Sequence, residues 1–208
     1  MSVLVRQLDT LKELINIGYG RAAGALCELT GERVTLEVPN LQIVSLQELT
    51  PALARTFKRQ VWSVHQVFSG AINGHALLIV DPPAATALTR AIVKDKIPQE
   101  QRDAIMQEAL GEVGNIVLQG AMGVCGEILK IQLKFSVPGL RVEGIHTMLK
   151  SAVVGEEGVR YALLIRTRFR LVAKKITGYM VVILGVTSFN RLLEAIDAWE
   201  ESSAGARG

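Results

Sequence analysis

Hydrophobic side chains recur at steps of four and three residues along two long stretches of the chain, a spacing typical of an amphipathic α-helix. We therefore expect two long helices, at residues 2–29 and 99–125, each of which buries one face. The first apolar seam consists of Leu4, Leu8, Leu11, Ile15, Gly18, Ala22, Ala25 and Leu29. The second seam repeats it with Leu110, Gly114, Val117, Ala121, Val124 and Ile128.

Both predicted helices also carry a polar stripe on the side away from the seam. Each stripe has an acidic residue, a glutamate four positions later and an asparagine three positions after that, so the three side chains share one helix face. This face lies roughly 160° around the helix from the seam, and we expect it to point to solvent or to a partner. A proline follows each stripe at the same distance. The members are Asp9, Glu13, Asn16 and Pro39 in the first half and Glu108, Glu112, Asn115 and Pro138 in the second.

Alternating patterns and breaker residues predict the other elements. Strands are expected at residues 32–46, 60–69, 74–81, 127–137, 147–154, 159–169 and 176–185. Asn73-Gly74 predicts a hairpin turn, residues 155–158 predict another turn, and Pro39 should mark a sheet edge or a strand end because it lacks an N–H. Shorter helices are expected at 84–93 and 188–199, a short helix or a connection at 50–59, and a disordered tail at 201–208. Glycines within the long helices predict close backbone approach.

The chain has the pattern of an internal duplication. Residues 74–81, GHALLIVD, resemble residues 178–185, GYMVVILG, and each segment precedes a predicted helix. One unit consists of a long helix, a strand up to a proline, hairpin strands and a shorter helix, and alone it would leave one sheet face uncovered. We therefore predict a single α/β domain at residues 1–202, made of two repeats at about 1–97 and 98–200 that share one core.

Composition narrows the class of protein. Of the 208 residues, 49% are hydrophobic and 21% charged, which argues against disorder, and a formal charge of +3 does not indicate a nucleic-acid partner. Residues 60–80 lack charge but contain polar residues and a hairpin turn, so membrane insertion is not expected. Cys27 and Cys125 fall at nearly matching places in the two long helices, which favours buried core thiols in a cytoplasmic protein.

One basic segment admits two interpretations. Three arginines alternate along a predicted strand and so share one face, and two lysines follow. Binding of nucleic acid or anionic lipid would suit such a segment. Phe169 falls on the opposite side, without the aromatic interleaving of a base-stacking surface, so a strand edge protected by charge is favoured. The basic residues are Arg166, Arg168, Arg170, Lys174 and Lys175.

The two polar stripes have a structural and a functional interpretation. Charged residues opposite an apolar seam are commonly a solvated face, and a helical asparagine can be kept for a hydrogen bond to a neighbouring strand. A carboxamide can also accept a hydrogen bond from water while it donates to another group, which suits placing water for attack on a phosphoryl group. The carboxylates suit a general base or a pairing with a partner's lysine. His65, His75 and His146 have no ligand-like spacing, which disfavours a metal site.

The duplicated pattern acid–x3–Glu–x2–Asn, with a proline about twenty residues later, resembles the CheC/CheX/FliY family of chemotaxis phosphatases. These proteins hydrolyse the aspartyl phosphate of the response regulator CheY. The stretches that carry the resemblance are DTLKELINIGYGRAAGAL with Pro39 and EALGEVGNIVLQGAMGV with Pro138. It covers nearly the whole chain, is closest to the CheC branch, and implies a duplicated, pseudo-symmetric fold with a shared, mainly antiparallel sheet flanked by two long helices.

The resemblance also implies roles by position. Asn16 and Asn115 would orient the attacking water, Glu13 and Glu112 would engage the regulator's lysine, and Asp9 and Glu108 would support docking. The protein would need no metal of its own, because Mg²⁺ would arrive with the phosphorylated regulator. The alternative is a non-catalytic protein that binds the regulator or the deamidase CheD, or a component similar to those of the flagellar switch.

Overall fold

The computed structural model describes residues 3–93, 99–152, 160–171 and 174–205. The predicted seam between the halves at 94–98, the turn at 155–158 and the last three residues lie outside these ranges. The elements are α1 (Val3–Thr30), β1 (Val34–Ser45), α2 (Leu46–Thr56), β2 (Val61–Gly70), β3 (Gly74–Val80), α3 (Pro82–Ile92), the 3₁₀ turn η1 (Gln99–Gln101), α4 (Arg102–Ile128), β4 (Leu133–Phe135), β5 (Gly139–Glu143), α5 (Ile145–Ala152), β6 (Arg160–Leu171), β7 (Lys174–Gly185) and α6 (Val186–Gly205).

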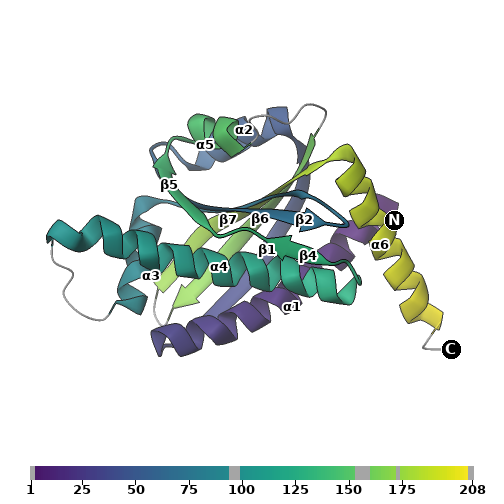
Figure 1. Ribbon diagram of the computed structural model, residues 1–208, viewed down its shortest axis with the longest axis horizontal. Coiled ribbons are helices and arrows are strands. Elements are labelled where there is room, and N and C mark those ends of the chain that lie inside the picture. The colour runs from purple at the N-terminus through teal and green to yellow at the C-terminus, as the bar shows by residue number, and fades with distance from the viewer. Residues whose placement is uncertain (1–2, 94–98, 153–159, 172–173, 206–208) are drawn as a thin grey trace.

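The strands form one seven-stranded antiparallel sheet in the order β1-β6-β7-β3-β2-β4, and β5 pairs with β2 beside β4. The edge strand of each half pairs with the hairpin of the other half, because β1 pairs with β6 while β4 and β5 pair with β2. Figure 1 shows α1 and α4 beneath this sheet and α2 and α5 above it. The mixed α/β fold with an antiparallel sheet flanked by two long helices confirms the predicted fold class.

Two apolar cores lie on opposite faces of the sheet. The larger one joins α1, α3, α4 and α6 to one face, and the smaller one joins α2 and α5 to the other. In α1 the predicted seam is correct at Leu11, Ile15 and Ala22, which are at most 3% exposed. It is wrong at Leu4, Ala25 and Leu29, which are exposed. The helix meets α6 near its start and β1 near its end, so its buried face turns along its length and a fixed repeat of four and three cannot follow it.

The shorter helices begin where the sequence supplies caps. The hydroxyl of Ser45 accepts from the Glu48 N–H and the Glu48 carboxylate accepts from the Ser45 N–H, so a capping box starts α2 at the end of β1. The Asp81 carboxylate accepts from the Ala84 N–H, and Pro82 begins α3 with a backbone angle suited to the first helical turn. Both caps turn the chain sharply from a strand onto a face of the sheet.

Close packing of α1 against α4 depends on glycines at the contact. A Cβ atom built on Gly18 would lie 2.4 Å from the carbonyl oxygen of Gly120, and one on Gly120 would lie 2.8 Å from the Cβ of Ala22. The prediction of close approach is therefore confirmed at these positions. It is wrong at four other helical glycines, where a Cβ would meet nothing within 4 Å: Gly20, Gly24, Gly111 and Gly123.

The second half departs from the predicted elements in three places. The strand expected at 127–137 is reduced to β4, because α4 continues to Ile128, and the unexpected β5 follows Pro138. The strand expected at 147–154 is instead α5, whose buried residues Ile145, Met148, Leu149 and Ala152 follow helical spacing. The alternation that suggested a strand was too short to distinguish the two periods.

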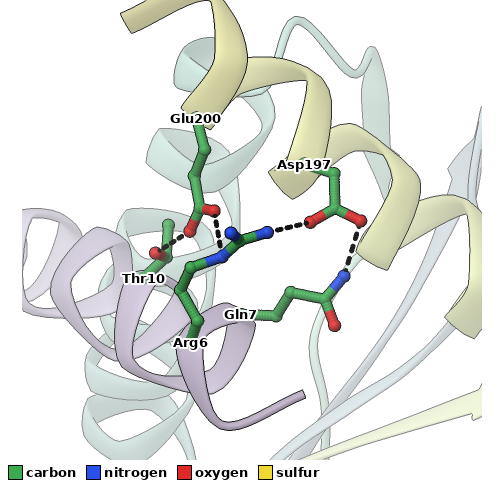
Figure 2. A network of polar contacts seen from close by, with 5 residues as sticks. All are labelled: Arg6, Gln7, Thr10, Asp197 and Glu200. Carbon is green, nitrogen blue, oxygen red and sulfur yellow. Dashed lines mark hydrogen bonds and ion pairs between the residues drawn. The ribbon is translucent and has the colours of Figure 1, made fainter. Parts of the chain in front are cut away.

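The last helix is longer than predicted, and the disordered tail expected from residue 201 is wrong as far as Gly205. Polar contacts hold the distal part of α6 to the first turns of α1 (Figure 2). Arg6 lies 3.2 Å from an Asp197 carboxylate oxygen and 2.7 Å from one of Glu200, while Gln7 donates to Asp197 at 2.8 Å and Thr10 donates to Glu200. These contacts anchor α6 to α1 directly before the segment ESSAG, through which the helix continues to Gly205.

A pair of stacked histidines on β2 and β3 predicts a dependence of stability on pH. His65 Nε2 lies 2.9 Å from His75 Nδ1, and burial, with smaller effects from His75 and Arg141, lowers the pKa of His65 to about 4. Because the unfolded chain binds this proton at its ordinary pKa of about 6.5, stability is complete above that pH and is lost as the pH falls toward 4.

We expect the free energy of unfolding to fall by about 1–2 kcal/mol over this interval, an amount reduced for the partial exposure of the ring. Denaturant unfolding of the wild type and of His65→Gln between pH 7 and pH 4 measures it. The variant should lose this part of the pH dependence, whereas His146→Gln, a change of an exposed histidine on α5, should keep it. Identical pH profiles for wild type and His65→Gln would contradict the assignment.

Candidate functional site

The structure places the two predicted stripes on corresponding faces of α1 and α4. The acidic side chains are exposed and each asparagine is half-buried. The expectation that the whole acid–amide face points to solvent is therefore confirmed for the acids and wrong for the asparagines. Each asparagine bonds to a residue of a neighbouring strand, as the structural interpretation predicted. The positions described are Asp9, Glu13 and Asn16 on α1 and Glu108, Glu112 and Asn115 on α4.

In the first site the asparagine is held by the backbone of the edge strand. The Val38 N–H donates to Asn16 Oδ1 at 3.1 Å. The pairing of β1 with β6 shifts register between Glu37 and Asn40, so Val38 and the exposed Pro39 form a bulge at the sheet edge. The predicted proline thus interrupts the ladder, as expected, and the N–H before it bonds to the helix.

In the second site the asparagine is held by side-chain amides instead of a backbone N–H. Gln66 Nε2 donates to Asn115 Oδ1 at 3.0 Å and also to the Ser136 carbonyl oxygen at 3.1 Å. Gln119, one turn along α4, donates to the same Asn115 oxygen at 2.6 Å. The edge strand is broken here, because β4 ends at Phe135 and β5 begins at Gly139, so Pro138 lies between two short strands.

The residue before each proline differs between the two sites. Val38 is 3% exposed and packs in the larger core, whereas Val137 is 87% exposed, the highest value among the large hydrophobic residues of the described chain. The Ser136 hydroxyl bonds with the backbone of both Val67 and Val137, which holds the broken strand against β2. The second site therefore presents an apolar side chain to solvent that the first site buries.

Because the protein bonds to the oxygen of each asparagine, the NH₂ group of each carboxamide is the part that a ligand can reach. A backbone N–H can only donate, so the group facing Val38 must be the oxygen of Asn16. The Gln66 NH₂ is oriented by the Ser136 carbonyl, so the same holds for Asn115. Within the described chain the NH₂ groups of both asparagines lack a partner. Each NH₂ group is therefore placed to donate to a ligand, and the expectation that the carboxamides position a water molecule stays a prediction.

Sequence reasoning missed three residues of the second site: Gln66, Gln119 and Val137. The strand residues around Gln66 gave one indication, because Val64 and Phe68 on the same face are apolar and buried. A glutamine between them has to find a partner inside the protein. Nothing in the local sequence distinguishes Val137 from Val38, since both precede a proline.

The two cysteines and the possible metal ligands add no further site in the described chain. Cys125 is buried, which raises the pKa of its thiol to about 12 and confirms a core role, while Cys27 is half-buried and bonds with the backbone of Val34. Among the described residues, no three His, Cys, Asp or Glu side chains gather closely enough to bind a metal ion. Within the same ranges, every helix is too short or too polar to span a lipid bilayer.

The basic strand is not the charged edge that was expected. It is β6, which lies inside the sheet between β1 and β7. Arg168 and Arg170 lie 3.3 Å and 3.6 Å from the carboxylate oxygens of Glu37 on β1, and Arg166 is exposed. Glu37 thus partly neutralises the charges on β6, and β1, not β6, forms the edge of the sheet.

Comparisons with known proteins find relatives over nearly the whole chain. No family model matches the chain. A curated relative, the CheY-P phosphatase CheC of Bacillus subtilis (strain 168), is 24% identical over 198 residues, which cover 92% of this chain and 94% of CheC.

Solved structures share the fold at lower identity. Thermotoga maritima FliY has a TM-score of 0.76 at 17% identity and covers 93% of this chain and 97% of its own. The FliM middle domain from Helicobacter pylori has a TM-score of 0.61 at 9% identity, with 91% and 98% covered. CheX from Desulfovibrio desulfuricans has a TM-score of 0.51 at 13% identity, with 82% and 99% covered. The chain is thus similar to CheC over nearly its whole length and has the fold of FliY and CheX, which confirms its resemblance to the CheC/CheX/FliY family.

Proposed function

We propose that this protein is a cytoplasmic chemotaxis phosphatase that hydrolyses the aspartyl phosphate of a CheY-type response regulator. The observation that carries the proposal is the pair of half-buried carboxamides, each held by its oxygen, with an exposed glutamate one turn away. The similarity to a CheC named for this activity supports it, because the similarity runs over nearly the whole of both chains.

In this mechanism the chain supplies orientation and the regulator supplies the reacting groups. The NH₂ of Asn16 or Asn115 donates a hydrogen bond to the oxygen of a water molecule and holds it in line with the phosphorus, so catalysis comes from positioning. Glu13 or Glu112 pairs with the regulator's lysine, and the first acid of each stripe extends the acidic contact. Mg²⁺ is carried by the phosphorylated regulator and neutralises charge on the phosphoryl group.

Phosphate release from purified candidate regulators, phosphorylated one at a time, tests the proposal. We expect at least one CheY-type regulator to lose its phosphoryl group about tenfold or more faster in the presence of this protein, because positioning a nucleophile and water contributes effects of this order or larger. The control is the same regulator with the protein heat-denatured. Tight binding to a phosphorylated regulator with an unchanged hydrolysis rate would contradict a catalytic role.

That contrary outcome defines the alternative, a non-catalytic protein that binds the regulator, CheD or a flagellar-switch partner. The observation that favours it is the shared fold with FliM, which was solved in complex with FliG and with SpeE. FliM thus binds partners with the same architecture, and a shared fold does not by itself imply that this protein hydrolyses phosphate. The two intact Glu–Asn pairs favour the phosphatase.

Val137 predicts a docking contact at the second site. We expect Val137→Ser to raise the Kd for the phosphorylated regulator by about 3–10-fold in a Glu13→Lys background, which weakens docking at the first site, because an exposed valine would be buried on docking. Titration calorimetry measures the affinity. The matched change Val38→Ser, at the buried counterpart, should instead lower the free energy of unfolding by about 1–3 kcal/mol. Unchanged affinity in the Val137 variant would remove this residue from the interface.

A further inference from the structure

We propose that Gln66 is the positioning residue of the second site and that it fixes the direction in which Asn115 presents its NH₂ group. The inference rests on the proposed function, in which that NH₂ holds the attacking water. Gln66 is 0% exposed and lies on the face of β2 that packs against α4, between the buried residues Val64 and Phe68. An apolar residue would pack there without a need for hydrogen bonds, so the glutamine needs a separate reason.

Its hydrogen bonds supply that reason. One amide group spans the helix and the sheet edge, because Nε2 donates both to Asn115 Oδ1 and to the Ser136 carbonyl. A flipped Gln66 would set its oxygen against two acceptors, so the orientation is determined. Its Oε1 is the one buried side-chain nitrogen or oxygen without a partner in the described chain. The two Nε2 hydrogens are thus both engaged by these two acceptors.

The first half holds its asparagine by a different route, which makes the role of Gln66 separable. Thr167 occupies the corresponding place on β6, opposite the bulge of β1. Its hydroxyl lies 2.7 Å from the Tyr19 hydroxyl and has no bond to Asn16, which is held by the Val38 N–H. A substitution at Gln66 should thus act on Asn115 alone.

The test uses Gln66→Met, which keeps the length of the side chain and removes both donors, in an Asn16→Ala background so that only the second site acts. We expect the maximal rate of regulator dephosphorylation to fall about tenfold or more, while the concentration of protein needed for half-maximal rate changes less than twofold. The matched control is Thr167→Val in the same background, which also alters a buried polar side chain at a bulge and should leave both values unchanged.

A second readout does not depend on catalysis. In nitrogen-15 NMR spectra the side-chain NH₂ protons of Gln66 should exchange with solvent at least tenfold more slowly than those of an exposed glutamine such as Gln47. The Asn115 side-chain resonances should shift in Gln66→Met but not in Thr167→Val.

Fast exchange at Gln66 in the wild type would overturn the inference even if Gln66→Met fails to fold. Unchanged Asn115 resonances together with an unchanged maximal rate in a folded variant would do the same. If the Asn16→Ala protein shows no phosphatase activity toward any regulator while the NMR pattern is as expected, the positional role stands and the proposed function is what fails.

Discussion

Replacing Asn16 and Asn115 together with alanine is expected to reduce accelerated dephosphorylation to the regulator's intrinsic rate while the affinity for the phosphorylated regulator stays within about threefold. The carboxamides are half-buried at the foot of each stripe, whereas the acids that would make the docking contact are exposed and unaltered. Truncation removes the NH₂ that holds the water but leaves the charged surface. Stopped-flow loss of the phosphorylated regulator gives the rate, and calorimetry gives the affinity.

The single variants divide this effect between the two halves. Asn16→Ala and Asn115→Ala should each retain the activity of the other site, so the two residual rates add up to about the wild-type rate if the sites act independently. Asn40→Ala, which removes an exposed asparagine two positions from Val38, is the matched control and should keep full activity. Undiminished acceleration in the double variant would exclude water positioning by these amides.

The stability of these variants should change little, which keeps the kinetic result interpretable. Asn16→Ala loses one hydrogen bond to the Val38 N–H. Because Asn16 is half-buried, water can enter the space left by the shorter side chain, so we expect a cost of about 0.5–1.5 kcal/mol. Asn115→Ala leaves Gln66 with the Ser136 carbonyl as its acceptor. Circular dichroism and thermal unfolding of the same preparations would show that both remain folded.

The site was predictable to the extent that it follows from helix periodicity. The spacing of Glu13 and Asn16, and of Glu112 and Asn115, places each pair on one face whatever surrounds the helix, and a proline breaks a strand ladder wherever it lies. Asn73-Gly74 correctly predicted a hairpin between β2 and β3, but the turn lies earlier, because Gly74 already pairs with Phe68 and the glycine with positive φ is Gly70. These features needed no knowledge of tertiary contacts.

What could not be predicted depends on which segments meet in space. Both Val38 and Val137 precede a proline, yet one is buried and the other exposed, because β1 continues through its bulge while the other edge strand is broken into β4 and β5. The partners of Asn115 come from a strand 49 residues away and from the next helical turn. Such differences between two halves with matching motifs are tertiary effects, which local propensity does not contain.

The glycine at the α1–α4 contact provides the largest expected effect on stability. Gly18→Ala should lower the free energy of unfolding by about 3 kcal/mol, the upper end of what overpacking costs. The added Cβ would lie 2.4 Å from the Gly120 carbonyl oxygen and 2.8 Å from the Ala121 Cα. Both obstacles belong to the backbone of α4, so no rotamer change can relieve them, and the two long helices have to move apart.

Gly20→Ala is the matched control in the same helix. A Cβ at Gly20 meets nothing within 4 Å, so the change should raise stability by up to about 1 kcal/mol through helix propensity alone. Chemical denaturation of both variants measures the contrast. Equal effects at the two positions would contradict close packing of α1 on α4. Because that contact fixes the separation of the two stripes, a folded Gly18→Ala protein should also change regulator binding at both sites, whereas Gly20→Ala should leave binding as it is.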